Sequence, residues 1–169
     1  MEYAIGITAA TAVGFFGSVI GFDKERSFYP VVLIVIATLY LLFAVMAKST
    51  GALVAEAIPA LVFVVMAALG FRKTPWLVVA GLALHGVFDF FHHAVIANPG
   101  VPVWWPSWCL AYDVVAAAYL AVLIIVRRAS GGAASRLPFR GARRNGNVSR
   151  EEGSMPGTPP NSADQVMKH

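Results

Sequence analysis

Long apolar runs separated by short polar connectors fill the first three quarters of the chain. A helix that crosses the hydrocarbon core of a bilayer needs about 20 mostly apolar residues. Five segments reach this length, and the connectors are as short as Lys48-Ser-Thr. Connectors this short make successive helices antiparallel and place them side by side. The pattern predicts an all-α integral membrane bundle of five transmembrane helices, over about residues 3–22, 29–47, 51–71, 75–97 and 107–126.

The apolar pattern stops after residue 126. Residues 127–169 are rich in Gly, Ser, Pro and Arg and contain almost no large apolar side chains. Such a segment cannot bury a core, so we expect a disordered tail after a membrane domain formed by residues 1–126. The tail's arginines at 136, 140, 143 and 144 are expected to be solvated or to touch anionic lipid head groups. We expect no nucleic-acid partner.

Composition and charge place the chain in the multi-pass membrane class. Hydrophobic residues make up 58% of the chain and charged residues 13%, with a mean hydropathy of +0.69. Lys and Arg concentrate in the first and third connectors and at the start of the tail, which five spans place on one side. The positive-inside rule then predicts an outer N-terminus and a cytoplasmic tail, in the cell (plasma or inner) membrane. The lipid bilayer is the expected partner.

Ionisable side chains interrupt three of the apolar segments. The six residues are Glu56, His85, Asp89, His92, His93 and Asp113. Steps of about 100° per residue place the four that share one segment within an arc of about 100°. Glu56 and Asp113 lie at a similar depth, about 9 Å below the outer helix ends. Ionisable groups in hydrocarbon are costly and usually functional, so we expect a polar pocket in the outer leaflet.

A divalent metal site explains this set of residue types. Neutral imidazole and carboxylate are good ligands for zinc, iron and manganese. The predicted metal ligands are His85, Asp89, His92 and His93. In a metal-dependent enzyme, Asp113 or Glu56 would act as the base for a metal-activated water. The outer-leaflet position favours a lipid or another apolar substrate.

Three other interpretations of the same residues stay open. Chains of Asp, Glu and His serve as proton or ion paths in transport proteins. Histidines can also be axial ligands of a haem. Finally, Asp89 is four residues from both His85 and His93, so the polar groups could satisfy one another in a purely structural network.

Two further features bear on packing. Gly6, Ala10, Gly14 and Ser18 form a small-residue stripe that lets another helix approach, either within the chain or in a homo-oligomer. The fourth connector, from Asn98 to Ser107, is rich in Pro and Trp. It is typical of an aromatic belt at the membrane interface, and a lid over the pocket is the alternative. Cys109, the one cysteine, is expected to be a buried apolar residue rather than a ligand.

A motif across residues 80–120 adds a family expectation. It consists of His85-x3-Asp89-x2-His92-His93, then Asn98-Pro-x-Val-Pro102, then Cys109-x3-Asp113. This motif resembles a family of small, uncharacterised bacterial integral membrane proteins, a domain of unknown function. The resemblance implies a compact multi-pass bundle with a polar outer pocket, and it implies no particular activity or substrate.

Overall fold

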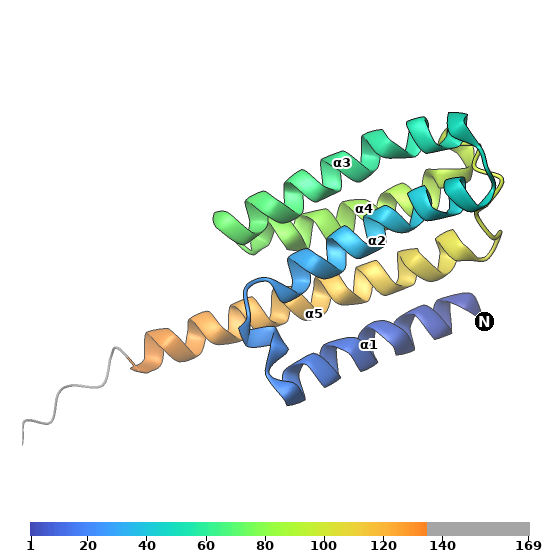
Figure 1. Cartoon of the computed structure of the whole chain (residues 1–169). Coiled ribbons are helices and arrows are strands. Elements are labelled where there is room, and N and C mark those ends of the chain that lie inside the picture. Colours follow the sequence, from blue (N-terminus) through green and yellow to red (C-terminus); the bar gives the residue numbers. More distant parts are fainter. Residues whose placement is uncertain (135–169) are drawn as a thin grey trace, which may run out of the picture. The chain divides into compact units, whose positions relative to one another are not determined.

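The computed structural model describes residues 1–134, with side chains up to Ser130. It contains α1 (Glu2–Ile20), a short 3-10 helix η1 (Phe22–Lys24), α2 (Phe28–Met46), α3 (Thr50–Arg72), α4 (Trp76–Val95) and α5 (Trp105–Ala134), and these described residues include no strand (Figure 1). All five α-helices are long and apolar enough to cross a membrane. The predicted all-α bundle of five transmembrane helices is confirmed.

Helix α5 is longer than the sequence pattern predicted. The helix was expected to end near residue 126, but it continues to Ala134. Apolarity marks where a helix leaves hydrocarbon, whereas its backbone hydrogen bonds continue through good helix formers such as Arg127, Arg128 and Ala129. The first eight residues of the predicted tail are therefore helical. Residues 135–169, with the arginine cluster and the predicted disorder, lie outside the described residues.

The order of packing differs from the order of the chain at one place. Helices α2, α3 and α4 pack on one another, and α5 packs on α4. Helix α1, however, lies along α5 and meets α2 mainly where Gly17 contacts the ring of Phe28 (Figure 1). Gly21 ends α1 in a left-handed conformation (φ 89°), and η1 then carries the chain across to α2. The expectation that each helix packs on its successor is therefore wrong for α1.

The small-residue stripe of α1 is the contact with α5. Gly6 lies so close to the Trp108 carbonyl that a Cβ there would collide with it. Gly14 faces the ring of Tyr119, and the Ser18 and Tyr119 hydroxyl oxygens are 2.8 Å apart. The stripe is thus an internal contact, and the predicted homo-oligomer would need a different surface.

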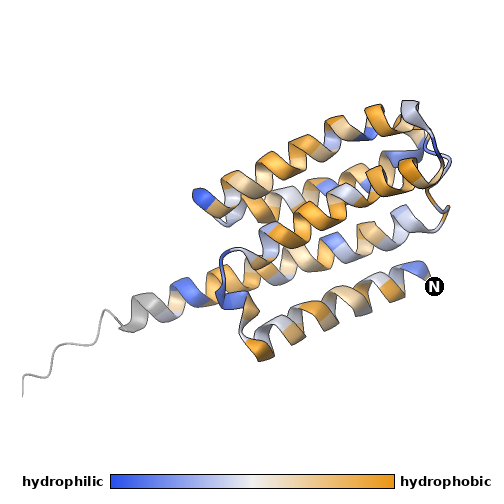
Figure 2. Cartoon of the chain, in the orientation of Figure 1, coloured by the Kyte–Doolittle hydropathy of each residue, from blue (hydrophilic) through white to orange (hydrophobic). Residues whose placement is uncertain are grey.

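The helix ribbons are mostly hydrophobic with scattered hydrophilic positions (Figure 2), and burial divides these into an apolar exterior and a partly polar interior. Large apolar side chains such as Phe15, Ile58 and Phe90 are exposed on the helix surfaces. The buried polar and charged side chains are Asp23, Glu56, His85, Asp89, His92, Asn98 and Asp113. A membrane protein has this distribution, because lipid solvates apolar side chains and polar groups must find partners inside.

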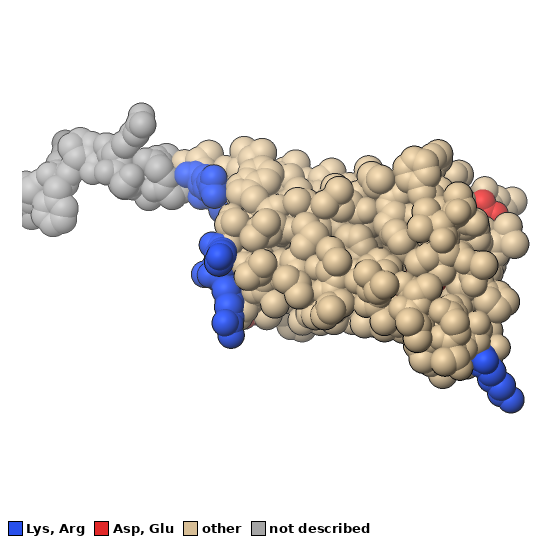
Figure 3. Space-filling model, turned by 90° about the horizontal axis from the view of Figure 1, so that it is seen from above, with Lys and Arg blue, Asp and Glu red and all other residues tan. Residues whose placement is uncertain are grey.

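Basic side chains gather at one end of the bundle (Figure 3). Arg127 on α5 binds Asp23 of η1 twice: Nη1 donates to the backbone carbonyl and Nη2 to the Oδ2 atom, each over 2.8 Å. This contact joins the first connector to the far end of α5, as the placement of Lys and Arg in the sequence required. Lys48 lies in the connector between α2 and α3, at the other end of α2.

Candidate metal centre

Helices α4 and α5 each supply two polar side chains to one buried cluster. His85 and Asp89 are four residues apart on α4, and Cys109 and Asp113 have the same spacing on α5. Four residues is about one helical turn, so each pair lies on one face of its helix. These two faces meet where α4 packs on α5. All four residues are at most 1% exposed.

The four side chains lie close enough to share one ion. One potential ligand atom from each falls within 4.8 Å of the others. The donors of a tetrahedral zinc site are about 3.3–3.8 Å apart, given bond lengths of about 2.0–2.3 Å. Small side-chain movements would therefore bring one nitrogen, one sulfur and two carboxylate oxygens around a single ion. This mixture of donors is one that zinc accepts.

Two oxygen atoms in the cluster have no hydrogen-bond partner among the described residues. His85 Nδ1 is 2.7 Å from Asp113 Oδ2 and 3.3 Å from Asp89 Oδ2, and the shorter contact alone has hydrogen-bond geometry. Asp89 Oδ2 and Asp113 Oδ1 are left without a partner. Buried polar atoms are nearly always paired, so both oxygens are available to a cation.

Tyr40 of α2 fixes the position of Asp89. Its hydroxyl donates to Asp89 Oδ1 over 2.6 Å, which leaves Oδ2 for the cluster. Hydrogen bonds from outer residues orient metal ligands in this way. The sequence pattern alone gave Tyr40 no role at the site. The available signal was an aromatic residue with a polar tip in the interior of an otherwise apolar helix.

A second buried polar group lies on the other side of Tyr40. Glu56 of α3 and His92 of α4 meet at 2.7 Å between Oε1 and Nε2. Asn98, in the fourth connector, donates to Glu56 Oε1 over 3.0 Å and to the Tyr40 carbonyl over 3.1 Å. The His92 ring stacks on Tyr40 with a centroid distance of 4.1 Å. Tyr40 therefore contacts both polar groups.

The fourth connector covers this end of the bundle. Asn98 and Val101 are buried, and Gly100 packs so tightly on the Phe43 carbonyl that a Cβ would collide with it. Trp105 packs edge-on against Phe43 at 4.9 Å. The connector thus contacts the polar network directly through Asn98, in addition to carrying tryptophans at the helix ends.

The predicted site residues fall into three groups. His85 and Asp89, predicted as ligands, join Asp113, predicted as a base, in the four-donor cluster. His92 and Glu56 pair with each other instead. His93 is exposed on the outer surface, because neighbouring helix positions differ by about 100° and only one of the two histidines can face inward. Cys109, expected to be merely apolar, is the fourth member of the cluster.

Comparisons of the chain with protein-family models, curated proteins and solved structures found no match. The resemblance of residues 80–120 to small bacterial membrane proteins stays a prediction.

Proposed function

We propose that this integral membrane protein binds one divalent transition-metal ion, with zinc as the first candidate, through His85, Asp89, Cys109 and Asp113. The observation that carries the proposal is the convergence of four potential donor atoms within 4.8 Å. Ligands from α4 and α5 mean that the ion would join two helices. Four protein ligands with no open position are typical of structural zinc sites.

Charge balance supports a cation at this position. Asp89 and Asp113 face the same buried space, with His85 as the nearest basic group. Two ionised carboxylates inside an apolar bundle are costly unless positive charge compensates them. A dication offsets two of the three negative charges that the two carboxylates and a Cys109 thiolate would carry, and it gives the unpaired oxygens a partner. Buried oxygens usually have a partner, so these two support a bound ion. Glu56 Oε2 and His92 Nδ1 in the neighbouring group also lack a partner, and the converging donors are what distinguish the four-residue cluster.

The polar network around the candidate centre occupies one half of α4. The network reaches from Asn98 in the fourth connector to His85 in the middle of α4. Toward the basic end, the buried residues beside it are Leu33, Ala67, Val78 and Leu82. Polar groups of that half, such as Tyr119, Ser18 and Asp23, lie along the contact of α1 with α5 and η1. We favour binding over conduction because four potential donor atoms converge within 4.8 Å at one point of the bundle.

Catalysis is not part of the proposal. The sequence suggested Asp113 or Glu56 as a base, but Asp113 belongs to the donor set and Glu56 is held by His92 and Asn98. An enzyme would also need a coordination position that a substrate can reach. Donors at most 1% exposed support a closed site instead.

Metal analysis of the purified full-length protein in detergent tests the proposal. After loading with zinc and removal of excess metal, we expect about one ion per chain in the wild type and none in a His85→Ala, Asp89→Asn, Asp113→Asn variant. His93→Ala is the matched control, because it removes an exposed imidazole from the same helix and should retain the ion. Equal metal in the triple variant, or none in folded wild type after loading with zinc, iron and manganese, contradicts the proposal.

Cobalt substitution tests the role of Cys109 separately. A thiolate ligand gives bound Co²⁺ a sulfur-to-metal charge-transfer band in the near ultraviolet. We expect this band in the wild type and its loss in Cys109→Ser with the visible ligand-field bands retained. A wild-type complex without the charge-transfer band would remove Cys109 from the ligand set.

We also propose that the basic end faces the cytoplasm, so that the metal centre lies toward the outer leaflet of the cell membrane. The support is the gathering of Lys24, Arg26, Arg72, Lys73 and Arg127 where α1 and α3 end and α2 begins. Reporter fusions after residue 134 should be active only as cytoplasmic reporters. Activity of a periplasmic or extracellular reporter at that position would reverse the orientation.

A further inference from the structure

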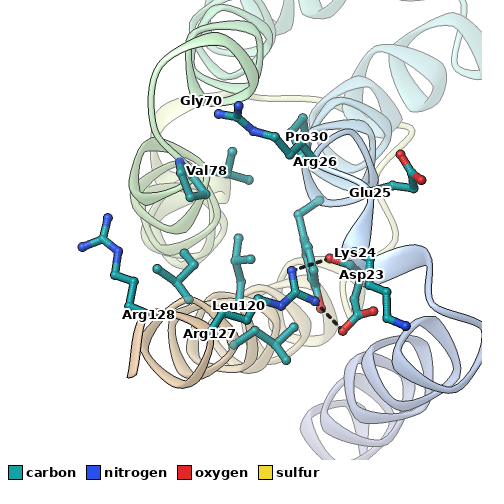
Figure 4. A pocket seen from close by; sticks show the side chains of 14 residues that line it. Asp23, Lys24, Glu25, Arg26, Pro30, Gly70, Val78, Leu120, Arg127 and Arg128 are labelled. Carbon is teal, nitrogen blue, oxygen red and sulfur yellow. Dashed lines mark hydrogen bonds and ion pairs between the residues drawn. The ribbon is translucent and has the colours of Figure 1, made fainter. Parts of the chain in front are cut away.

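A cavity lined by several charged side chains lies at the basic end of the bundle. It has a volume of about 330 Å³ and lies among η1, the start of α2, the α3–α4 turn and the end of α5. Figure 4 shows basic side chains, including Arg26, Arg127 and Arg128, around an interior that contains Val78 and Leu120. The cavity thus has a charged mouth and an apolar interior.

The charge at the mouth is predominantly positive. Lys24, Arg26, Arg127 and Arg128 line it, against Asp23 and Glu25. Asp23 is already engaged by Arg127, whose guanidinium it holds in place. Among the described residues, the other three basic side chains form no ion pair. They are free to bind an anion, and arginine suits a phosphate because its planar N–H groups match the phosphate oxygens.

A buried hydroxyl without a partner lies in the wall of the same cavity. Tyr29 is 6% exposed, and its hydroxyl makes no hydrogen bond among the described residues. A buried tyrosine hydroxyl usually finds a partner. Tyr29 is therefore a second, independent indication of a polar ligand group at this position, since it is neutral and comes from α2 rather than from the basic connector.

We propose that the cavity binds an anionic phospholipid of the bilayer. The phosphate would lie among Arg26, Arg127 and Arg128, with an oxygen within reach of the Tyr29 hydroxyl, and the first part of an acyl chain would lie against Val78 and Leu120. A volume of about 330 Å³ is at the small end of ligand sites, so it holds the head of such a lipid and not its whole length. The cavity lies at the ends of membrane-spanning helices, at the depth where head groups begin.

Lipid binding to the full-length protein in a neutral detergent tests this proposal, with native mass spectrometry as the readout. We expect phosphatidylglycerol to bind at one molecule per chain and phosphatidylcholine to bind at least about tenfold more weakly, because its choline offsets the phosphate charge. Inorganic phosphate should not displace the lipid. Equal binding of the two lipids overturns the proposal, and displacement by inorganic phosphate would make the cavity a site for free phosphate.

Variants separate this site from general attraction to a basic surface. Arg26→Gln with Arg128→Gln should weaken phosphatidylglycerol binding by about tenfold. Tyr29→Phe removes the hydroxyl alone and should weaken it by about fivefold. Lys73→Gln is the matched control, because Lys73 lies at the same end of the bundle but does not line the cavity. If Lys73→Gln weakens phosphatidylglycerol binding as much as the double arginine variant does, the proposal is overturned. Circular dichroism confirms that each variant is folded.

Discussion

Helix α4 has two halves with different surroundings. In its first half, Val78 and Leu82 are buried among apolar residues such as Leu33 and Ala67. In its second half, His85, Asp89 and His92 are buried just as completely, but among Tyr40, Glu56, Cys109 and Asp113. One continuous helix therefore passes from an apolar core into a polar network.

This difference indicates that the apolar half of α4 contributes mainly to stability and the polar half mainly to metal binding. Association of helices in a bilayer depends on close van der Waals packing, which the apolar half supplies. The polar half contains unpaired oxygen atoms that a core built only for stability would avoid. Substitutions in the first half should therefore change the free energy of unfolding, and substitutions in the second half should change metal affinity.

The largest effect is expected in the apolar half. Leu33→Ala removes a side chain that is 0% exposed, and the resulting cavity should cost about 2–5 kcal/mol of unfolding free energy. Unfolding of the detergent-solubilised protein would measure this loss. Leu42→Ala, on the same helix but 49% exposed, should cost much less. If Leu33→Ala also lowered zinc affinity in the folded protein, the division into two halves would be wrong.

A somewhat smaller loss of unfolding free energy is expected at the contact between α1 and α5, which runs past both halves of α4. Gly6→Leu places a side chain against the Trp108 carbonyl and should cost about 1–3 kcal/mol, because backbone rather than a flexible side chain must move. The shift in unfolding midpoint measures this cost. Gly51→Leu is the control, since nothing lies within 4 Å of a Cβ added there. Equal shifts in the two variants would mean that α1 does not pack as described.

In the polar half, Tyr40→Phe should act on binding more than on folding. It keeps the ring stacked on His92 but removes the hydroxyl that orients Asp89. We expect zinc affinity to fall about tenfold, or about 1.4 kcal/mol, in a competition titration with a zinc chelator. Tyr119→Phe, which removes a hydroxyl bonded to Ser18 far along α5, should leave zinc affinity unchanged. Unchanged affinity in Tyr40→Phe would remove Tyr40 from the support of the centre.

The smallest effect is expected at the basic end. Asp23→Asn weakens the contact with Arg127, whose side chain is 47% exposed. Partly exposed ion pairs contribute about 1 kcal/mol or less, and added salt screens them. Unfolding measured in low and in high salt should show that Asp23→Asn lowers the unfolding free energy slightly, and that the difference from wild type becomes smaller as the salt concentration rises. A loss that salt does not change would mean that the contact acts through hydrogen bonding rather than charge.

Prediction from the sequence succeeded for features that helical periodicity and depth in the membrane determine. Apolar length identified all five helices, and the spacing of His85 and Asp89 placed both on one buried face. Prediction failed where the role of a side chain depends on which residues of another helix lie next to it. Nothing local to Cys109 distinguishes a small core residue from a member of the cluster, and His92 and His93 differ only in the direction that helix packing selects.

The sequence by itself determined that the chain forms five membrane-spanning helices and that the buried ionisable side chains of α3, α4 and α5 lie toward the end opposite the basic residues. Both properties follow from hydropathy and helical geometry, which are local. The tertiary structure alone decided that α1 packs on α5, that Tyr40 contacts Asp89, and that Glu56 binds His92 rather than joining the four-donor cluster. These contacts join residues up to about a hundred positions apart, and which helix faces meet depends on side-chain shapes across the whole bundle.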